Sequence, residues 1–471
     1  MATYLPSAFL DSLTRLDHFD RESFLSVHDS GEQSVSVHMN PGKPLLANGQ
    51  WKENITQPPF DISGKVPWAP DAWYLRNRPS FTLDPLFHAG TYYVQEASGM
   101  FLAHALKQVA DDSEKIRVLD LCAAPGGKST LIQSLISPES MLLSNEVIKS
   151  RVPVLYQNMT KWGCANGIIS NNDPNDFMKL PGFFDILLID APCSGSGLFR
   201  KDPEASKVWS PELVKLCSQR QKRILADAWI CLKENGFLIY STCSYSKEEN
   251  EDLLDQLFHD YACESVCLSP DPSWNIVETR SDQAGAIGYR FYPDKLAGEG
   301  FFLSVIRKKQ SRDSAADDHD ARSKKKIKRI PVPDSGFAVQ QLNSWIKEGA
   351  LQYVHVGETL HGLPSGLLND FEILKSRLYL KKAGIRLGRA GEHEWVPDHE
   401  LALANVLKPE LPLLDVGKQD ALRFLRGEPI EFEVQERGWR VVSYQNQRIG
   451  WVKLLEKRMN NYYPKSWRIR Q

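Results

Sequence analysis

The middle of the chain alternates short apolar runs with longer amphipathic segments, and this alternation limits the possible fold more than any other feature. Five runs of strand-forming residues lie at 116–122, 140–146, 167–172, 184–190 and 236–242. Segments with helical periodicity separate them, among them 127–136 and 211–233. Strands that alternate with helices build a largely parallel sheet covered on both faces. The pattern therefore predicts an α/β domain over residues 92–310, with a further strand at 301–308.

Two regions flank this domain. At roughly 150 residues per domain, a chain of 471 residues is long enough for about three domains. Residues 1–91 combine an amphipathic start with Pro- and Trp-rich stretches, which indicates a small N-terminal α/β module. Residues 311–330 are polar and carry blocks of charge, as in a linker. Residues 331–471 end in a stretch rich in strand formers and turns, which predicts a small β-rich module.

Charge is balanced over the whole chain and uneven along it. The formal net charge is −2, yet six of the eight residues from Arg322 to Arg329 are cationic. From Arg437 to Arg470 there are nine Lys/Arg and a single acidic residue, Glu456. Local basic surface of this kind suits a phosphate backbone. There is no apolar run long enough to cross a membrane and no secretion signal at the start, so we expect an intracellular, cytoplasmic protein with no membrane partner.

The eight cysteines all fall between Cys122 and Cys267. They include no C-x-x-C pair, and the Cys263–Cys267 spacing is not accompanied by a pair of histidines. A metal site is therefore not expected. Disulfides are disfavoured in a reducing compartment. Core thiols and reactive thiols remain as the two interpretations.

A turn of small residues, 122–127, joins the first predicted strand to the following helix and indicates a nucleotide-type pocket. The Gly-Lys-Ser that follows invites a P-loop reading, but that motif requires glycine at the position of Cys122. Doubly wound folds place an acidic residue about 20 residues after the glycines, where it binds ribose hydroxyls. Glu146 lies 20 residues after Gly126, which suits a cofactor that carries adenosine. Asp173, after the third strand, is a candidate for the adenine side of the pocket.

Three reactive side chains are expected at one edge of the sheet. Asp190 and Cys193 follow the fourth predicted strand, and Cys243 follows the fifth. Ligands of open α/β sheets bind outside the carboxyl ends of the strands, so these groups should share a crevice. Ser246 and Glu249 have the spacing of a capping box, which predicts a helix just beyond Cys243 whose dipole favours a thiolate.

Three sequence blocks resemble those of the RNA cytosine-C5 methyltransferases, the NOL1/NOP2/Sun family. They are LDLCAAPGGKST, LLIDAPCSGSGLFRKDP and YSTCSYSKEEN, which cover most of residues 116–250. Three further segments, 36–43, 288–308 and 444–469, resemble the bacterial branch that acts on the 16S rRNA of the small ribosomal subunit. The resemblance thus extends over nearly the whole chain, weakly at the N-terminus and in residues 330–400. The chain departs from the family at His38, where other members often carry arginine.

The resemblance implies a Rossmann-like S-adenosylmethionine (SAM)-dependent domain with a C-terminal PUA-like module. It implies Cys243 as the nucleophile that attacks cytosine C6, Cys193 as the group that assists product release, and Asp190 as a partner of the pyrimidine N3 edge. The reversed arrangement of the thiols, as in DNA cytosine-C5 methyltransferases with their Pro-Cys motif, remains open. The candidate cofactor-binding residues are Cys122, Ala123, Ala124, Pro125, Gly126, Gly127, Lys128, Glu146, Asp173 and Asp190.

The expected partner is RNA, and 16S rRNA or the small ribosomal subunit on the strength of the resemblance, with the enzyme acting as a monomer. A tRNA substrate and a non-catalytic role in ribosome assembly are the alternatives. We expect the basic tail and the N-terminal module to hold RNA, and removal of 331–471 to leave cofactor binding intact. The aromatic residues of the tail, interpreted as core or turn packing, are Trp439, Trp451, Tyr462, Tyr463 and Trp467.

Overall fold

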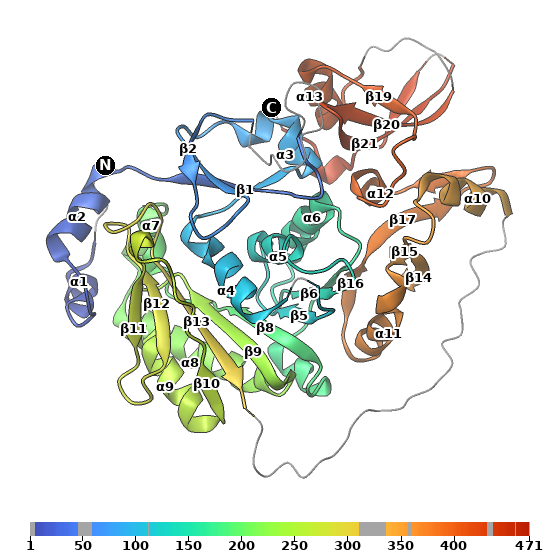
Figure 1. The fold of residues 1–471 in the computed structure, drawn as a ribbon. Helices are drawn as coiled ribbons and strands as arrows, with labels where there is room; N and C mark the ends of the chain where they lie inside the picture. The colour runs from blue at the N-terminus through green and yellow to red at the C-terminus, as the bar shows by residue number, and fades with distance from the viewer. Residues whose placement is uncertain are drawn as a thin grey trace.

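The computed structural model describes residues 5–45, 59–111, 113–309, 336–356, 359–430, 437–456 and 458–470 (Figure 1). These residues form one ten-stranded sheet and three four-stranded sheets. The predicted linker 311–330, with its basic run Arg322–Arg329, lies outside the described residues. Within the described residues, no helix combines the length and apolar character needed to span a membrane.

The central sheet contains every strand predicted for the middle of the chain. Its five core strands are parallel, and β13 runs antiparallel beside β9. β9 begins at Leu232, so the last residues of the segment predicted as helix belong to the strand, where Leu232 pairs with Phe184. In spatial order the strands are β11 (Val277–Arg280), β12 (Ile287–Phe291), β13 (Phe301–Lys308), β9 (Leu232–Thr242), β8 (Phe184–Asp190), β5 (Arg117–Asp120), β6 (Met141–Asn145), β7 (Gly167–Ser170) and β16 (Leu380–Ala383), and β10 (Cys263–Ser265) pairs with β13.

Helices cover both faces of this sheet (Figure 1). They are α4 (Leu102–Val109), α5 (Gly127–Gln133), α6 (Val152–Trp162), α8 (Pro211–Trp229) and α9 (Glu251–Asp260). Val118 of β5 packs into an apolar core with α4, α5 and α6, whereas its neighbour Leu119 packs into a second core with α8 and α9. Leu188 and Leu187 of β8 divide in the same way. Alternate strand residues point to opposite faces, so both faces of these strands are buried against helices.

The N-terminal region has a sheet of its own and two helices that lie apart from it. The sheet contains β2 (Ile62–Lys65), β3 (Ala72–Leu75), β1 (Val35–Met39) and β4 (Tyr92–Val94). Helices α1 (Ser7–Leu13) and α2 (Arg21–Ser30) pack on the central domain instead. The rings of Phe9 and Phe24 meet Tyr245 with centroids 6.1 and 5.4 Å apart, which places both helices beside the segment that carries Cys243.

The C-terminal region builds two sheets. Their strands are β14 (Gln352–Val356), β15 (Thr359–Leu363), β17 (Ile385–Ala390) and β18 (Trp395–Pro397), then β19 (Leu413–Asp415), β20 (Gly438–Tyr444), β21 (Gln447–Leu454) and β22 (Met459–Asn461). Of the tail aromatics, Trp439, Trp451 and Tyr463 are buried in these modules, as predicted. Tyr462 is 36% exposed and Trp467 is half-buried, so these two do not serve core packing alone.

The C-terminal region is also part of the central domain. β16 extends the central sheet by pairing antiparallel with β7. Helix α11 (Leu368–Arg377) places Phe371 and Leu374 in the core that lies under α8 and α9. Removing 331–471 would expose that core, so the expectation that such a truncation leaves cofactor binding intact no longer follows.

Candidate active site

The candidate residues gather at the carboxyl ends of the parallel strands. β5 lies between β6 and β8: the chain passes from β5 to β6 and β7 on one side, and then crosses back to β8 and β9 on the other. Such a switch in strand order opens a crevice above the sheet, because the loops on either side diverge. The turn 121–126 follows β5, Glu146 follows β6, Asp190 ends β8 and Cys243 follows β9. The predicted crevice is therefore where the fold places these groups.

The turn after β5 is shaped by glycine. Gly126 precedes α5 with φ at +113°, a conformation that side chains with a Cβ disfavour. Ala123 N–H donates to the Asn145 carbonyl at 2.8 Å, which joins the turn to the end of β6. At Gly127, an added Cβ would lie 3.0 Å from Cε1 of Tyr93, so the N-terminal module approaches the turn closely. Gly126 makes no side-chain capping bond to α5, so the backbone N–H groups at the start of this helix are candidates to bind a ligand.

Glu146 is buried and only partly satisfied. Its Oε1 accepts the Ile148 N–H at 2.9 Å, while Oε2 lies 3.3 Å from Arg151 Nη1 without a hydrogen-bond partner in the described residues. Arg151 also donates to the Ala124 carbonyl at 2.5 Å, which ties Glu146 to the glycine turn. A buried carboxylate oxygen left without a donor fits the hydroxyls of a ribose, as predicted for an adenosine cofactor.

Asp120 is a buried carboxyl that the sequence reasoning missed. Its Oδ2 accepts Ser129 Oγ at 2.6 Å, and Oδ1 has no hydrogen-bond partner in the described part of the chain. Burial raises the pKa of Asp120 to about 7. The group lies at the base of the glycine turn, where it anchors the first turn of α5.

Asp173 is placed differently from the other candidates. Its Oδ1 accepts the Asn175 N–H at 3.1 Å and caps a short 3-10 helix, Pro174–Lys179. It also lies 3.5 Å from Arg223 Nη1 on α8. The residue follows β7 at the correct edge of the sheet, but the contacts described are with its own turn and α8. Its contact with adenine stays a prediction.

Asp190 and Lys128 form an ion pair inside the crevice. Lys128 Nζ lies 2.7 Å from Asp190 Oδ2, and Ser241 Oγ donates to Asp190 Oδ1 at 2.8 Å. Burial acts to lower the pKa of Lys128, but the Asp190 carboxylate outweighs it and raises that pKa. Lys128 also lies 5.2 Å from the ring centroid of Phe301 on β13. The pair thus fixes a carboxylate beside the two thiols, and Ser241 is a positioning residue that the sequence reasoning missed.

The two candidate thiols are in contact. Cys193 Sγ lies 3.1 Å from Cys243 Sγ, and both cysteines are free and half-buried. β8 and β9 are adjacent and parallel, with Asp190 opposite Ser241, so the loops that follow them leave side by side. The hydrogen bond to Cys243 and burial both raise the pKa of Cys193 well above its ordinary value. The two thiols therefore lie within reach of one another, at the edge of the sheet where Asp190 ends β8.

The predicted capping box at Ser246 is wrong. Ser246 makes no side-chain capping bond, and a 3-10 turn, Lys247–Glu249, precedes α9. The Glu249 carboxylate is fully buried and points back to the crevice, because hydrogen-bond donors there satisfy it. It accepts Ser194 N–H at 2.8 Å and the hydroxyls of Ser194 and Ser244, each at 2.5 Å. Glu249 thus links the residues that follow the two cysteines, a role for which the sequence held no local signal.

His38, the departure from the family pattern, is a core residue. It is 1% exposed, its ring stacks on Tyr93, and burial lowers its pKa to about 3. Its Nε2 lies 3.3 Å from Thr130 Oγ1 on α5. A neutral, buried ring of this kind is placed to pack the N-terminal sheet on the glycine turn.

Gly197 allows the loops that carry Cys193 and Cys243 to pack closely against the start of β13. Its N–H donates to the Cys243 carbonyl at 2.8 Å, and its carbonyl accepts Gly300 N–H at 3.0 Å. A Cβ at Gly197 would lie 2.2 Å from the Gly300 carbonyl oxygen and 2.9 Å from that of Cys243. We expect Gly197→Ala to destabilise the protein by about 1–3 kcal/mol, as overpacking does, and to displace Cys243. Thermal melting and free-thiol labelling measure the two effects.

Gly64→Ala is the matched control for that substitution, because a Cβ there meets nothing within 4 Å. An unchanged melting temperature for Gly197→Ala would contradict the close packing of these loops.

The amino-acid sequence matches three family models in chain order. They are the N-terminal domain of 16S rRNA methyltransferase RsmF at residues 5–97, 16S rRNA methyltransferase RsmB/F at 105–307, and the methyltransferase RsmF PUA domain at 412–469. Residues 308–411 lie between the second and third matches.

Curated relatives match over nearly the full chain. Ribosomal RNA small subunit methyltransferase F of Shewanella loihica is 28% identical, with 97% of this chain and 94% of that protein covered. The protein of the same name from Salmonella agona is 29% identical, with 98% and 96% covered.

Solved structures share the fold. PH0851 has a TM-score of 0.55 at 23% identity, over 64% of this chain and 66% of that one. NSun6 from Pyrococcus horikoshii with SFG has a TM-score of 0.50 at 16% identity, over 66% of this chain and all of that one.

These matches agree with the architecture. The predicted fold class, a SAM-dependent methyltransferase domain between an N-terminal α/β module and a C-terminal PUA module, is confirmed by the central sheet and the order of the matched models. The chain belongs to the RsmB/F family of 16S rRNA methyltransferases.

Proposed function

We propose that this protein transfers a methyl group from SAM to C5 of a cytosine in 16S rRNA, through a covalent adduct with Cys243. The observation that carries the proposal is the pair of free thiols 3.1 Å apart, beside the Asp190–Lys128 ion pair. The relatives named above are rRNA small subunit methyltransferases, which supports the choice of substrate. A single chain supplies every candidate catalytic group, which fits a monomer. We propose the cytoplasm as its place of action.

The proposed cofactor site consists of the turn 122–127 with Lys128, Glu146, Asp173 and Asp190. The unpartnered Oε2 of Glu146 and the N–H groups at the start of α5 suit the ribose and the polar end of SAM. When bound there, SAM supplies the methyl group. SFG, an analogue of SAM, accompanies the similar NSun6 structure, which supports the choice of cofactor.

The proposed chemistry begins with the thiolate of Cys243. C5 of cytosine is a poor nucleophile until a thiolate adds to C6, which forms a C–S bond and makes C5 electron-rich. Cys243 is assigned the attack on the resemblance of its sequence block, and the reversed arrangement, with Cys193 as the nucleophile, is the alternative. Asp190 is positioned by Ser241 and Lys128 to hold the N3 edge of the pyrimidine.

The second half of the proposed reaction releases the product. Once C5 carries the methyl group, its proton must leave to a base so that the C–S bond to Cys243 can break. Cys193, whose sulfur lies 3.1 Å from that of Cys243, is assigned to accept the C5 proton as a thiolate, while Cys243 leaves C6 as a thiolate. The target cytosine must leave its stack to reach two recessed thiols, so we expect it to be flipped into the crevice.

The test is bisulfite sequencing of total RNA from a strain that lacks the gene. We expect one cytosine of 16S rRNA to lose its protection in the deletion strain, and the gene restored with Cys243→Ala to leave it unprotected. Loss of protection in a tRNA, with 16S rRNA unchanged, would assign the enzyme to tRNA. An unchanged pattern in both RNAs would favour a non-catalytic assembly factor.

A further inference from the structure

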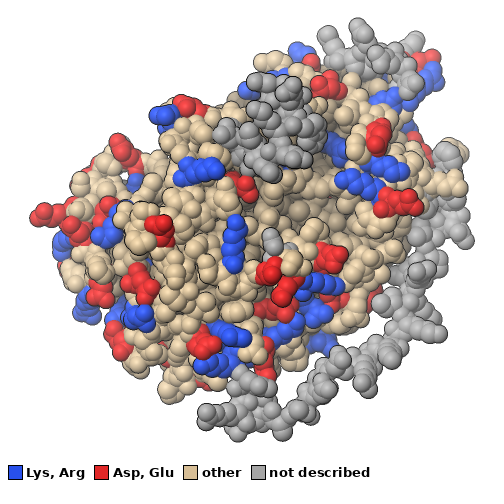
Figure 2. Space-filling view, viewed as in Figure 1, with Lys and Arg blue, Asp and Glu red and all other residues tan. Residues whose placement is uncertain are grey.

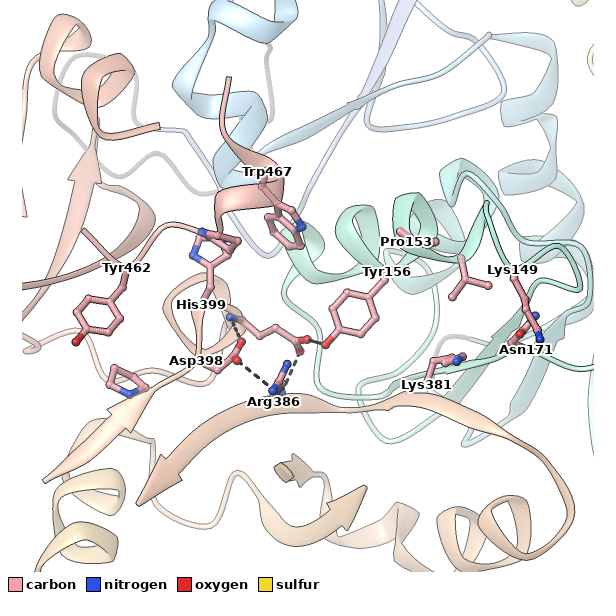
Figure 3. A pocket seen from close by; sticks show the side chains of 14 residues that line it. Lys149, Pro153, Tyr156, Asn171, Lys381, Arg386, Asp398, His399, Tyr462 and Trp467 are labelled. Carbon is pink, nitrogen blue, oxygen red and sulfur yellow. Dashed lines mark hydrogen bonds and ion pairs between the residues drawn. The ribbon is translucent and has the colours of Figure 1, made fainter. Parts of the chain in front are cut away.

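A cavity of about 670 Å³ lies outside the catalytic crevice, between α6 and the C-terminal region (Figure 3). Its lining comes from α6, β16, β17, helix α12 (His399–Leu403) and the 3-10 helix η8 (Lys465–Trp467). None of the candidate catalytic residues lines it. It borders the cofactor site, because Asn171 in its wall donates to the backbone carbonyls of Glu146 and Val147 at 2.6 and 3.1 Å.

One end of the cavity is aromatic and carries an unsatisfied histidine. His399 is 7% exposed, and neither ring nitrogen has a hydrogen-bond partner in the described residues. Its ring meets Tyr463 and Trp467 edge-on, with centroids 5.0 and 5.1 Å apart. Burial lowers the pKa of His399 to about 3, so the ring is neutral. Its two nitrogens are themselves buried in the wall and do not face the cavity, so His399 packs the aromatic rings at this end into place.

The other end is cationic. Figure 3 places Lys149, Asn171 and Lys381 together there, away from His399 and Tyr462. Neither Lys149 nor Lys381 forms an ion pair within the described chain, and Lys381 Nζ donates to the hydroxyl of Tyr379, an aromatic residue that is 61% exposed. These two lysines are free to bind an anion.

The acidic groups between the two ends are already paired. Asp398 lies 3.3 Å from Arg386, and Glu400 is bound by Lys382 and Tyr156. The cavity therefore presents available positive charge at one end and an aromatic surface at the other. On the face shown in Figure 2, by contrast, charges of both signs are interspersed around a broad uncharged centre.

We propose that this cavity binds one unstacked nucleotide of the RNA substrate, distinct from the target cytosine. Its base would stack against Trp467 and Tyr462, and its phosphate would lie on Lys149 and Lys381. The volume is within the range of about 300–1,000 Å³ for small-molecule sites. Proteins bind single-stranded RNA by stacking splayed bases on aromatic rings and reading their edges. The inference rests on the proposed function, since it assumes an RNA substrate.

The first test removes the two free charges. We expect Lys149→Ala/Lys381→Ala to weaken binding of transcribed 16S rRNA about tenfold and to lower the slope of log K against log salt by about 1–2. The KM for RNA should rise while kcat at saturating RNA stays near that of the wild type. Lys107→Ala/Lys222→Ala is the control, because it removes the same charge from exposed sites elsewhere.

The second test addresses the base. We expect Trp467→Ala to weaken RNA binding about fivefold or more, because it removes a stacking surface, with SAM binding unchanged. In the wild type, a 16S rRNA transcript containing 4-thiouridine should cross-link to the peptide that carries Tyr462 and Trp467, and in Trp467→Ala that cross-link should fade.

The outcomes separate this inference from the proposed function. A wild-type enzyme that methylates 16S rRNA, with pocket variants that match the control and no cross-link at Tyr462 or Trp467, would overturn the nucleotide site alone. A wild-type enzyme that methylates no 16S rRNA overturns the proposed function instead. A defect seen only on assembled subunits, with a cross-link to a ribosomal protein, would replace the nucleotide with a protein partner.

Discussion

Cys243→Ala is expected to abolish methyl transfer, whereas Cys193→Ala is expected to trap the enzyme on its RNA. Without the Cys243 thiol no bond to C6 can form, and loss of a covalent nucleophile lowers the rate on the order of 10⁴-fold or more. Without Cys193 the attack can proceed, but release of the product lacks its assisting group. The Cys193→Ala protein should then migrate with RNA through a denaturing gel after incubation with SAM. The two sulfurs lie only 3.1 Å apart. A different outcome for the two variants would therefore reflect different chemical roles of the two thiols.

Cys231→Ala is the control for both substitutions. Cys231 is fully buried in the core beside α8, so its loss should cost about 1 kcal/mol of stability and trap nothing. A trapped complex with Cys243→Ala and none with Cys193→Ala would reverse the two roles. Equal, mild losses from both would reduce the pair to core packing.

Asp190→Asn is expected to lower kcat about 10²- to 10³-fold, the range for removing one preorganised electrostatic contact in an active site. The asparagine keeps an oxygen that can accept from Ser241, so the geometry survives. The charge that holds Lys128 is lost, and with it the largest of the effects that raise the Lys128 pKa against burial. Single-turnover methylation at saturating SAM and RNA measures the effect on the chemical step.

Asp185→Asn offers a matched comparison at the other end of the same strand. Asp185 also pairs with a lysine, Lys233, and accepts the Arg117 N–H at 2.7 Å. Both substitutions remove a carboxylate–lysine pair from β8, but only the one at Asp190 faces the crevice. If the two variants lost the same fraction of kcat, Asp190 would be a structural residue without a role in the reaction.

The core strands and the edge at which the chemistry lies were both predictable from the sequence. Runs of apolar residues with helical segments between them specify parallel strands, and all parallel strands end at the same edge. Glu146, Asp190 and Cys243 each follow such a run, so their meeting required no knowledge of side-chain packing. The glycine turn was readable for the same reason, since the need for a positive φ at Gly126 is local.

The hydrogen-bond partners of those groups were decided by tertiary structure. Glu249 has the spacing of a helix cap relative to Ser246, yet it binds Ser194, which lies 55 residues earlier in the chain. The hydrogen bond of a local capping motif competes with bonds to every donor that folding brings near the carboxylate. A fully buried carboxylate forms the set of hydrogen bonds that satisfies it best.

By itself, the sequence determined the α/β architecture, the glycine turn and the two thiols at one edge, because these depend on periodicity and on conformations within a few residues. Only the tertiary structure decided that β16 completes the central sheet, that Tyr462 and Trp467 face a cavity, and that His399 is buried without a partner. Those features arise where segments more than 200 residues apart pack together. Their energies depend on which surfaces meet, and no local pattern of residues encodes that choice.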